Sequence, residues 1–155
     1  MNEELICQVV EKAVREAGKT VMTLETAKKL IDMVEKKAEE MGIAVIIAVA
    51  DKAARPVAVH CMDDAYIASF DIALNKAYTS AGLKMSTAEL SKLSGPGQPL
   101  YGIQHTNEGK IVVFGGGEVL ERNGRIAGAL GVSGGTLEQD TFLAAYGREV
   151  FGQIK

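Results

Sequence analysis

The chain is poor in the residues that mark several functional classes. Its 155 residues include no tryptophan, 5% aromatic residues, two histidines and two cysteines. Cys7 and Cys61 lie far apart and do not form the disulfide framework of a small secreted protein, which favours a reduced cytoplasmic environment. A structural zinc site needs four ligands in recognisable pairs, and the sequence contains no such set.

An excess of positive charge and a long apolar run are also missing. The net charge is −3, from 17 basic and 20 acidic residues that are dispersed along the chain. Nucleic-acid binding requires a concentrated positive patch, so we expect no nucleic-acid partner. The longest apolar run, residues 43–50, is too short to span a bilayer, and the N-terminus lacks a signal-peptide core. We therefore expect one cytoplasmic domain over residues 1–155, with no membrane partner.

Glycine is what the chain has in abundance, with 17 residues. Two clusters, Gly115–Gly117 and Gly134–Gly135, flank two β-type runs joined by Asn123-Gly124. The Asn-Gly pair predicts a hairpin, because both residues tolerate the positive φ of a type I′ turn. Thr136 and Gln139 have the spacing of a capping box that starts the last helix. We expect the glycine bends to open a cleft at one rim of the sheet, and any site to use that edge.

Apolar spacing and turn residues predict the remaining elements. Thr23 and either Asp63 or Asp64 are candidate N-caps, and Ser86 with Glu89 forms a second capping box. Small residues repeat at helical spacing between residues 65 and 81, which favours very close helix packing. The predicted helices cover residues 3–17, 24–41, 65–83, 87–93 and 137–152, and the predicted strands cover 43–50, 56–62 and three further runs from Ile111 onwards.

The predicted order is therefore α-α-β-β-α-(α)-β-β-β-α. Hairpins without strand-helix-strand alternation indicate an antiparallel sheet in the α+β class. Five strands with helices on both faces would form a three-layer α/β/α sandwich.

Nucleotide and nucleophile motifs are weak. The glycines complete neither a P-loop nor a dinucleotide fingerprint, although Gly115–Gly117 could form either a nest for an anion or a structural bend. Ser133 lies in a Gly-x-Ser-x-Gly pattern, but both histidines precede it and the sheet is expected to be antiparallel, which argues against a serine hydrolase. Ser133 is expected to cap a turn or to bond a ligand.

The two histidines are the candidate metal or haem ligands. On a strand, His60 and Met62 would share one face while Cys61 takes the other, so His60 and Cys61 cannot approach one metal together without a bulge. His60 and His105 are each either an axial haem ligand or an ordinary polar residue. Lys76 interrupts the small-residue stripe, so it reaches solvent, meets a buried acceptor or offers its charge to a ligand carboxylate.

Four segments of the chain together match a known family pattern. They are Asp64-Ala65 through Lys76-Ala77-Tyr78-Thr79, Phe114-Gly115-Gly116-Gly117, Gly128-Ala129-Leu130-Gly131-Val132-Ser133-Gly134-Gly135, and Gln139-Asp140. In combination they resemble the GlcG/HbpS-like haem-binding, haem-degrading family, and in particular its PduO C-terminal-domain-like branch.

The resemblance implies a profilin-like fold with a five-stranded antiparallel sheet, and a homo-oligomer that is often an octamer. It also implies a link to diol, glycerol or corrinoid metabolism, sometimes inside bacterial microcompartments. Candidate cofactor-binding residues are His60, His105, Lys76, Phe114, Gly115, Gly116, Gly117 and Ser133.

Two departures from the family pattern limit what the resemblance carries. Glu118-Val119-Leu120 follows the triple glycine where members commonly have proline, and residues 1–59 contain no histidine. A haem ligand on the N-terminal helices therefore cannot be carried over. We also expect no adenosyltransferase domain of the kind that precedes this module in PduO-type proteins, so that activity is not expected.

Three functions remain open. The first is a small-molecule module that binds a tetrapyrrole, with haem preferred over a corrinoid. The second is a non-catalytic, oligomeric accessory protein that docks a pathway enzyme. The third and least favoured is an enzyme whose acid-base pair would combine His105 with Glu118, Glu121 or Asp140.

Overall fold

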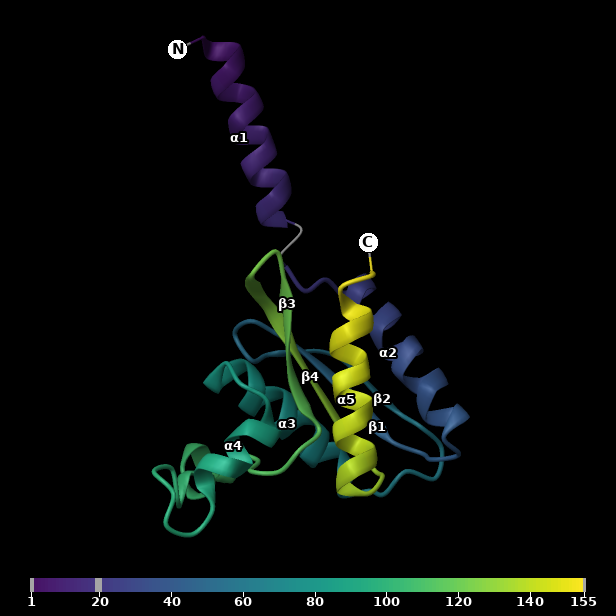
Figure 1. Ribbon diagram of the computed structural model, residues 1–155. Helices are drawn as coiled ribbons and strands as arrows, with labels where there is room; N and C mark the ends of the chain where they lie inside the picture. The colour runs from purple at the N-terminus through teal and green to yellow at the C-terminus, as the bar shows by residue number, and fades with distance from the viewer. Residues whose placement is uncertain (1, 19–20, 155) are drawn as a thin grey trace.

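The computed structural model describes residues 2–18 and 21–154 and has an α+β fold (Figure 1). Within those residues, no helix is both long and apolar enough to cross a membrane. Along the chain the elements are α1 (Glu3–Gly18), α2 (Leu24–Glu40), β1 (Ile46–Asp51), β2 (Pro56–Cys61), α3 (Ser69–Leu83), α4 (Thr87–Ser94), the short 3₁₀ helices η1 (Ile103–His105) and η2 (Asn107–Gly109), β3 (Gly117–Arg122), β4 (Arg125–Ser133) and α5 (Leu137–Phe151).

The sheet is antiparallel, with the strand order β2-β1-β4-β3. The described residues form four strands rather than the five expected. The missing strand is the one predicted from Ile111. Ile111 and Val112 are buried, but the Val112 N–H donates to Thr79 Oγ1 on α3, at 3.0 Å, instead of to a neighbouring strand. An apolar run that packs against a helix therefore resembled a strand in the sequence.

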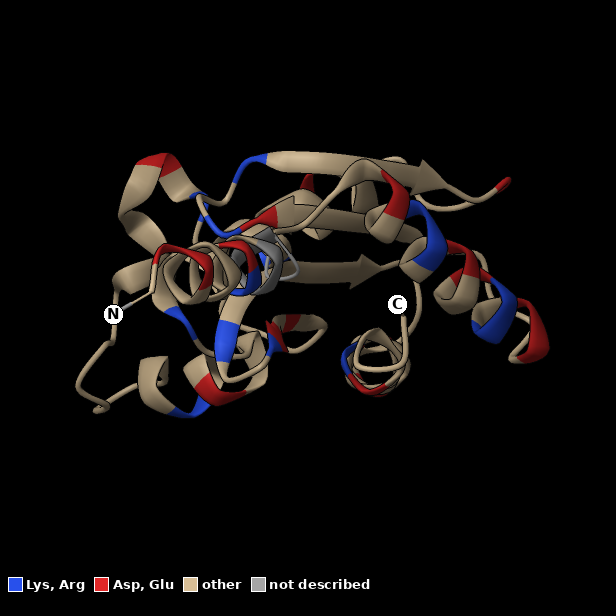
Figure 2. Cartoon of the chain, turned by 90° about the horizontal axis from the view of Figure 1, so that it is seen from above, with Lys and Arg blue, Asp and Glu red and all other residues tan. Residues whose placement is uncertain are grey.

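Helices cover both faces of the sheet (Figures 1 and 2). Alternate residues of β1 separate the two cores. Ile47 and Val49 face α2 and α5, whereas Ile46 and Ala48 face α3. Both faces of β1 are thus buried, as the continuous aliphatic run predicts. Figure 2 also shows that basic and acidic residues are interspersed rather than gathered by sign.

α3 lies very close to the centre of the sheet. Ala73 and Ala77 of its small-residue stripe are buried, and a Cβ at Gly131 of β4 would overlap the carbonyl oxygen of Ala73. The helix begins at Ser69, later than predicted, and neither Asp63 nor Asp64 caps it. Asp64 has a φ of +66°, which interrupts helical geometry, and the intervening residues form turns.

The N-cap and the capping boxes predicted at the starts of three other helices are confirmed. The Thr23 side chain caps α2, and both capping boxes form, at Ser86 for α4 and at Thr136 for α5. The turn between β3 and β4 has positive φ at Asn123 and Gly124, of 54° and 70°. These features depend on neighbouring residues alone, which is why the sequence predicts them well.

α1 is a helix, as predicted, but it stands away from the sheet layers in Figure 1. Its large apolar side chains are between 43% and 66% exposed. Cys7 of the same helix is exposed as well. The amphipathic pattern therefore marks a face that the rest of the described chain does not cover.

Candidate functional site

The two glycine clusters lie together at one end of the sheet. Gly116 precedes β3, and its carbonyl oxygen accepts the Val132 N–H of β4 at 2.8 Å. Gly134 and Gly135 directly follow β4. Because β3 and β4 are antiparallel, the start of one and the end of the other share this rim.

The triple-glycine bend is filled by the protein's own side chains. A Cβ at Gly115 would overlap Thr141, and one at Gly116, where φ is +110°, would lie 2.5 Å from Lys76 Nζ. The Gly117 N–H already donates to Thr87 Oγ1 at 2.8 Å. The expected cleft is therefore absent at this bend, and its geometry favours a structural role over an anion nest.

Lys76 joins the two helical layers at this rim. Its side chain is 0% exposed, and Nζ donates to the Val132 carbonyl at 2.7 Å and to Asp140 Oδ2 at 2.8 Å. Lys76 belongs to α3 on one face of the sheet, whereas Asp140 belongs to α5 on the other. The ring of Phe114 lies over the ammonium, with its centroid 5.1 Å from Nζ. Burial lowers the pKa of Lys76, while Asp140 acts in the opposite direction.

The same ion pair orders the second glycine bend. Asp140 Oδ1 accepts the Gly135 N–H at 2.8 Å, so the carboxylate bridges Lys76 and the loop that starts α5. Ser133, just before this loop, is buried, and its Oγ lies 3.2 Å from Ser69 Oγ. Ser133 therefore contacts α3 instead of an open pocket.

A pocket of about 420 Å³ opens at the second bend. Gly134, Gly135 and Thr136 form one wall, and Tyr66, which is 74% exposed, stands on another. The remaining lining residues are Ile43, Ala44, Asp64 and Gln139. A hollow at the rim therefore exists, but at Gly134–Gly135 and not at the triple glycine.

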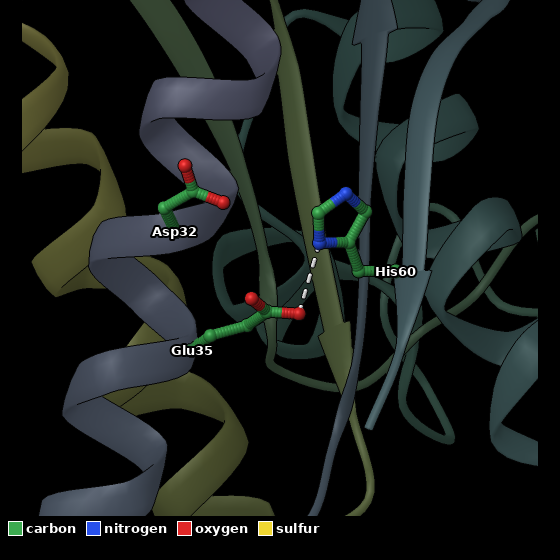
Figure 3. A group of neighbouring side chains, drawn as sticks. All are labelled: Asp32, Glu35 and His60. Carbon is green, nitrogen blue, oxygen red and sulfur yellow. Dashed lines mark hydrogen bonds and ion pairs between the residues drawn. The ribbon is translucent and has the colours of Figure 1, made fainter. Parts of the chain in front are cut away.

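The two histidines lie elsewhere. His105 ends η1 in an exposed segment that projects from the body beside α4 in Figure 1. His60 is on β2, on the face covered by α2, where Nδ1 lies 2.9 Å from Glu35 Oε1 (Figure 3). The predicted site residues thus occupy separate places: His60 under α2, His105 in the projecting loop, and Lys76, Phe114, the three glycines and Ser133 at the rim.

A second pocket, of about 490 Å³, contains two of the three acids considered for acid-base chemistry. Glu118 and Glu121 line it together with Glu89 and Arg148. Burial raises the pKa of Glu118, opposed by the Arg148 guanidinium, whose Nη1 lies 3.1 Å from Glu118 Oε2. His105 is not among its lining residues, so the structure does not bring the predicted acid-base pair together there.

Sequence reasoning missed the two acidic residues that lie near His60. Asp32 and Glu35 project from α2 toward His60, and the three side chains are close neighbours (Figure 3). Two acids three residues apart on a helix are a visible pattern. Their meeting with β2, however, depends on how the helix docks on the sheet.

Fold and site define a small α+β domain with a pocket at the rim of its sheet. The chain belongs to the HbpS-like family: the family model described as "Haem degrading protein HbpS-like" matches residues 22–149.

Named relatives place the chain more finely within that family. It is 44% identical to a Citrobacter freundii protein called "Uncharacterized 15.0 kDa protein in dhaT-dhaS intergenic region", over 86% of this chain and 94% of that one. It is 34% identical to the corrinoid adenosyltransferase PduO of the same organism, over 92% of this chain but 42% of PduO. A crystal structure of a PduOC:haem complex superposes with a TM-score of 0.80 at 32% identity, covering 83% of this chain and 94% of that one.

Proposed function

We propose that this chain binds haem and works beside enzymes of diol, glycerol or corrinoid metabolism. The observation that carries the proposal is the PduOC:haem complex, whose chain is 32% identical and has the same fold at a TM-score of 0.80. The haem-degrading family to which the chain belongs supports the same ligand. A corrinoid is the second ligand to test, because PduO is a corrinoid adenosyltransferase.

The pocket beside Gly134 and Gly135 is the place in this chain that best fits one edge of a flat macrocycle. Ile43 and Ala44 form an apolar part of the pocket wall. Ile67, which follows Tyr66 in the chain, is 94% exposed and adds apolar surface nearby in the sequence. The positive end of the α5 dipole favours carboxylates such as haem propionates.

Tyr66 is our candidate iron ligand among the residues that line this pocket, since tyrosine serves as a haem ligand in some proteins. His60 and His105 lie outside the pocket lining, so both are tested beside Tyr66 as alternative ligands. Bound haem would supply an iron centre, and the chain's own residues would bind and orient it.

Haemin titration of the purified protein tests the proposal. We expect a saturable shift of the Soret band with a fixed ratio of haem to chain. Tyr66→Phe should weaken binding by about tenfold if its oxygen ligates the iron, the equivalent of 1.4 kcal/mol. Tyr101→Phe, which alters a tyrosine that is 65% exposed outside the pocket, is the matched control. No Soret shift in the wild-type protein would overturn haem binding, and loss of the shift in His60→Ala or His105→Ala would move the ligand there.

A second candidate function is assembly, favoured by the uncovered face of α1. Leu5, Val9 and Val10 present apolar surface that the described chain leaves exposed at 52%, 60% and 54%. Such a face is typical of a helix that docks in a partner's groove. The exposed apolar face supports one of two kinds of assembly. The chain could form a homo-oligomer, for which the resemblance implies an octamer. Alternatively, it could be an accessory protein that docks a pathway enzyme, in the cytoplasm or in a microcompartment. Copurification of a stoichiometric partner without bound pigment would favour assembly over haem binding.

A further inference from the structure

We infer that Asp32, Glu35 and His60 form a binding site for a divalent first-row transition-metal ion, separate from the haem pocket. The three residues come from two elements, α2 and β2, and their candidate ligand atoms all lie within 4.8 Å of one another. Figure 3 shows Glu35 and His60 facing each other across the gap between helix and strand, with Asp32 one turn away on α2.

The donor atoms already lie near the spacing that an ion requires. Metal–oxygen and metal–nitrogen bonds of about 2.0–2.2 Å place adjacent ligand atoms about 3.0–3.5 Å apart. Glu35 Oε1 and His60 Nδ1 are 2.9 Å apart. Asp32 is exposed, so rotation of its side chain can close the remaining distance without moving the backbone.

The charge balance favours a cation at this place. Asp32 and Glu35 are two carboxylates on one face of the helix, and like charges at this spacing destabilise a helix. Nearby Lys29 pairs instead with Glu25, at 2.8 Å. Within the described part of the chain, the Asp32 side chain has no hydrogen-bond or ion-pair partner. A bound cation would relieve the repulsion and give Asp32 a partner.

The donor set selects the kind of ion. One imidazole nitrogen and two carboxylate oxygens suit Mn²⁺, Fe²⁺, Co²⁺ or Zn²⁺, whereas Mg²⁺ and Ca²⁺ prefer oxygen ligands alone. The side chains of Glu35 and His60 are 26% and 35% exposed. The site is therefore partly open to solvent, and water can complete the coordination of an ion held by three protein ligands.

Co²⁺ and Zn²⁺ are the probes that test the site. With metal-free, haem-free full-length protein, we expect one Co²⁺ per chain, visible as d–d absorption and displaced by Zn²⁺. Glu35→Gln and His60→Gln should each weaken Co²⁺ affinity at least tenfold, because each removes one ligand. Asp71→Asn removes one negative charge from the exposed start of α3, on the other face of the sheet, and should leave the affinity unchanged.

Exposed thiols are the main competing ligands, since Cys7 and Cys61 are both free and Cys61 follows His60 directly. The titration is therefore repeated in the Cys7→Ser/Cys61→Ser double variant, where binding should persist. Loss of Co²⁺ binding in that variant, or wild-type affinity in either Glu35→Gln or His60→Gln, would overturn the site. Circular dichroism of each variant separates loss of a ligand from loss of the fold.

Discussion

At the scale of single residues, Lys76 is the side chain on which the rim depends. It is fully buried, and its Nζ lies 2.8 Å from Asp140 Oδ2. A buried charge left without its partner is far more costly than the pair itself. Lys76 thus illustrates how a charged residue can belong to the core while stabilising a loop.

We predict that Lys76→Met destabilises the protein by about 3–5 kcal/mol, because the Asp140 carboxylate is left unpaired in the interior. Urea unfolding measures the change. Lys76→Met/Asp140→Asn should recover a large part of the loss, since Asn keeps an acceptor for the Gly135 N–H without the charge. Lys29→Met, which breaks the exposed pair with Glu25, should change stability by less than about 0.5 kcal/mol. A double variant as unstable as Lys76→Met alone would contradict this account.

Glu118 gives a second prediction, on pH. Burial raises the pKa of its carboxyl above the ordinary value of 4.5, against the opposing effect of Arg148. The contribution of Glu118 to stability is therefore fully present below pH 4.5 and is lost as the pH rises through the folded-state pKa. As the pH rises through this pKa, the free energy of unfolding of Glu118→Gln should therefore increase relative to that of wild type.

Urea unfolding of wild type and Glu118→Gln at a series of pH values from about 4 to 8 measures the effect, a range that spans the ordinary carboxyl value. Glu149→Gln is the matched control, because it removes the same charge from an exposed position on α5. If the wild-type and Glu118→Gln stabilities stayed parallel over this range, the raised pKa of Glu118 would be wrong.

The sequence could not show which charged side chains meet in the folded protein. The sequence left three roles open for Lys76, and only the fold shows that Asp140 lies beside it, 64 residues further along the chain. The approach of Glu35 to His60 likewise spans 25 residues. Such pairs depend on how helices dock on the sheet, which no local pattern encodes.

At the scale of helices and strands, the distance between α3 and β4 controls the architecture. Gly131 has no side chain, and the carbonyl oxygen of Ala73 occupies the place where a Cβ would be. Because the obstacle is backbone, the contact cannot be relieved by rotating a side chain. The whole of α3 would have to move away from the sheet.

We predict that Gly131→Ala destabilises the protein by at least the roughly 1–3 kcal/mol typical of overpacking. Thermal or urea unfolding measures it. Gly82→Ala, on α3 itself, is the control: a Cβ there meets nothing within 4 Å, so the change should stabilise the protein by about 0.5–1 kcal/mol through lower backbone entropy in the unfolded state. Equal stability of the Gly131→Ala variant and wild type would show that α3 can shift freely.

The same scale shows where sequence patterns succeed and fail. Capping boxes at Ser86 and Thr136 fix helix starts through contacts three residues apart, so they were predictable. The segment from Ile111 was expected to be a strand because it is apolar, yet its backbone bonds to Thr79 of α3. An apolar run predicts that a segment is buried, but both strands and extended segments packed on helices are buried.

At the scale of the whole molecule, α1 and α2 have similar amphipathic sequences, but the apolar face of α2 is buried whereas that of α1 is exposed. Leu30 and Val34 of α2 are 0% exposed against the sheet, whereas Val10 of α1 is 54% exposed. An apolar stripe therefore predicts that a helix will be covered, but not what will cover it. In α2 the cover is the chain's own sheet, and in α1 the proposed cover is another chain.

This contrast yields the last prediction. Val10→Asp should change the free energy of unfolding of the separated chain by less than about 0.5 kcal/mol, because an exposed position contributes little to stability. Leu30→Ala in α2 should cost about 2–5 kcal/mol, as buried leucine truncations do. If α1 mediates assembly, Val10→Asp should also shift the protein to a smaller species in size-exclusion chromatography. Gln8→Asp, a substitution at a neighbouring exposed polar position, should not produce that shift. Loss of several kcal/mol in Val10→Asp without any change in size would mean that α1 packs on its own chain.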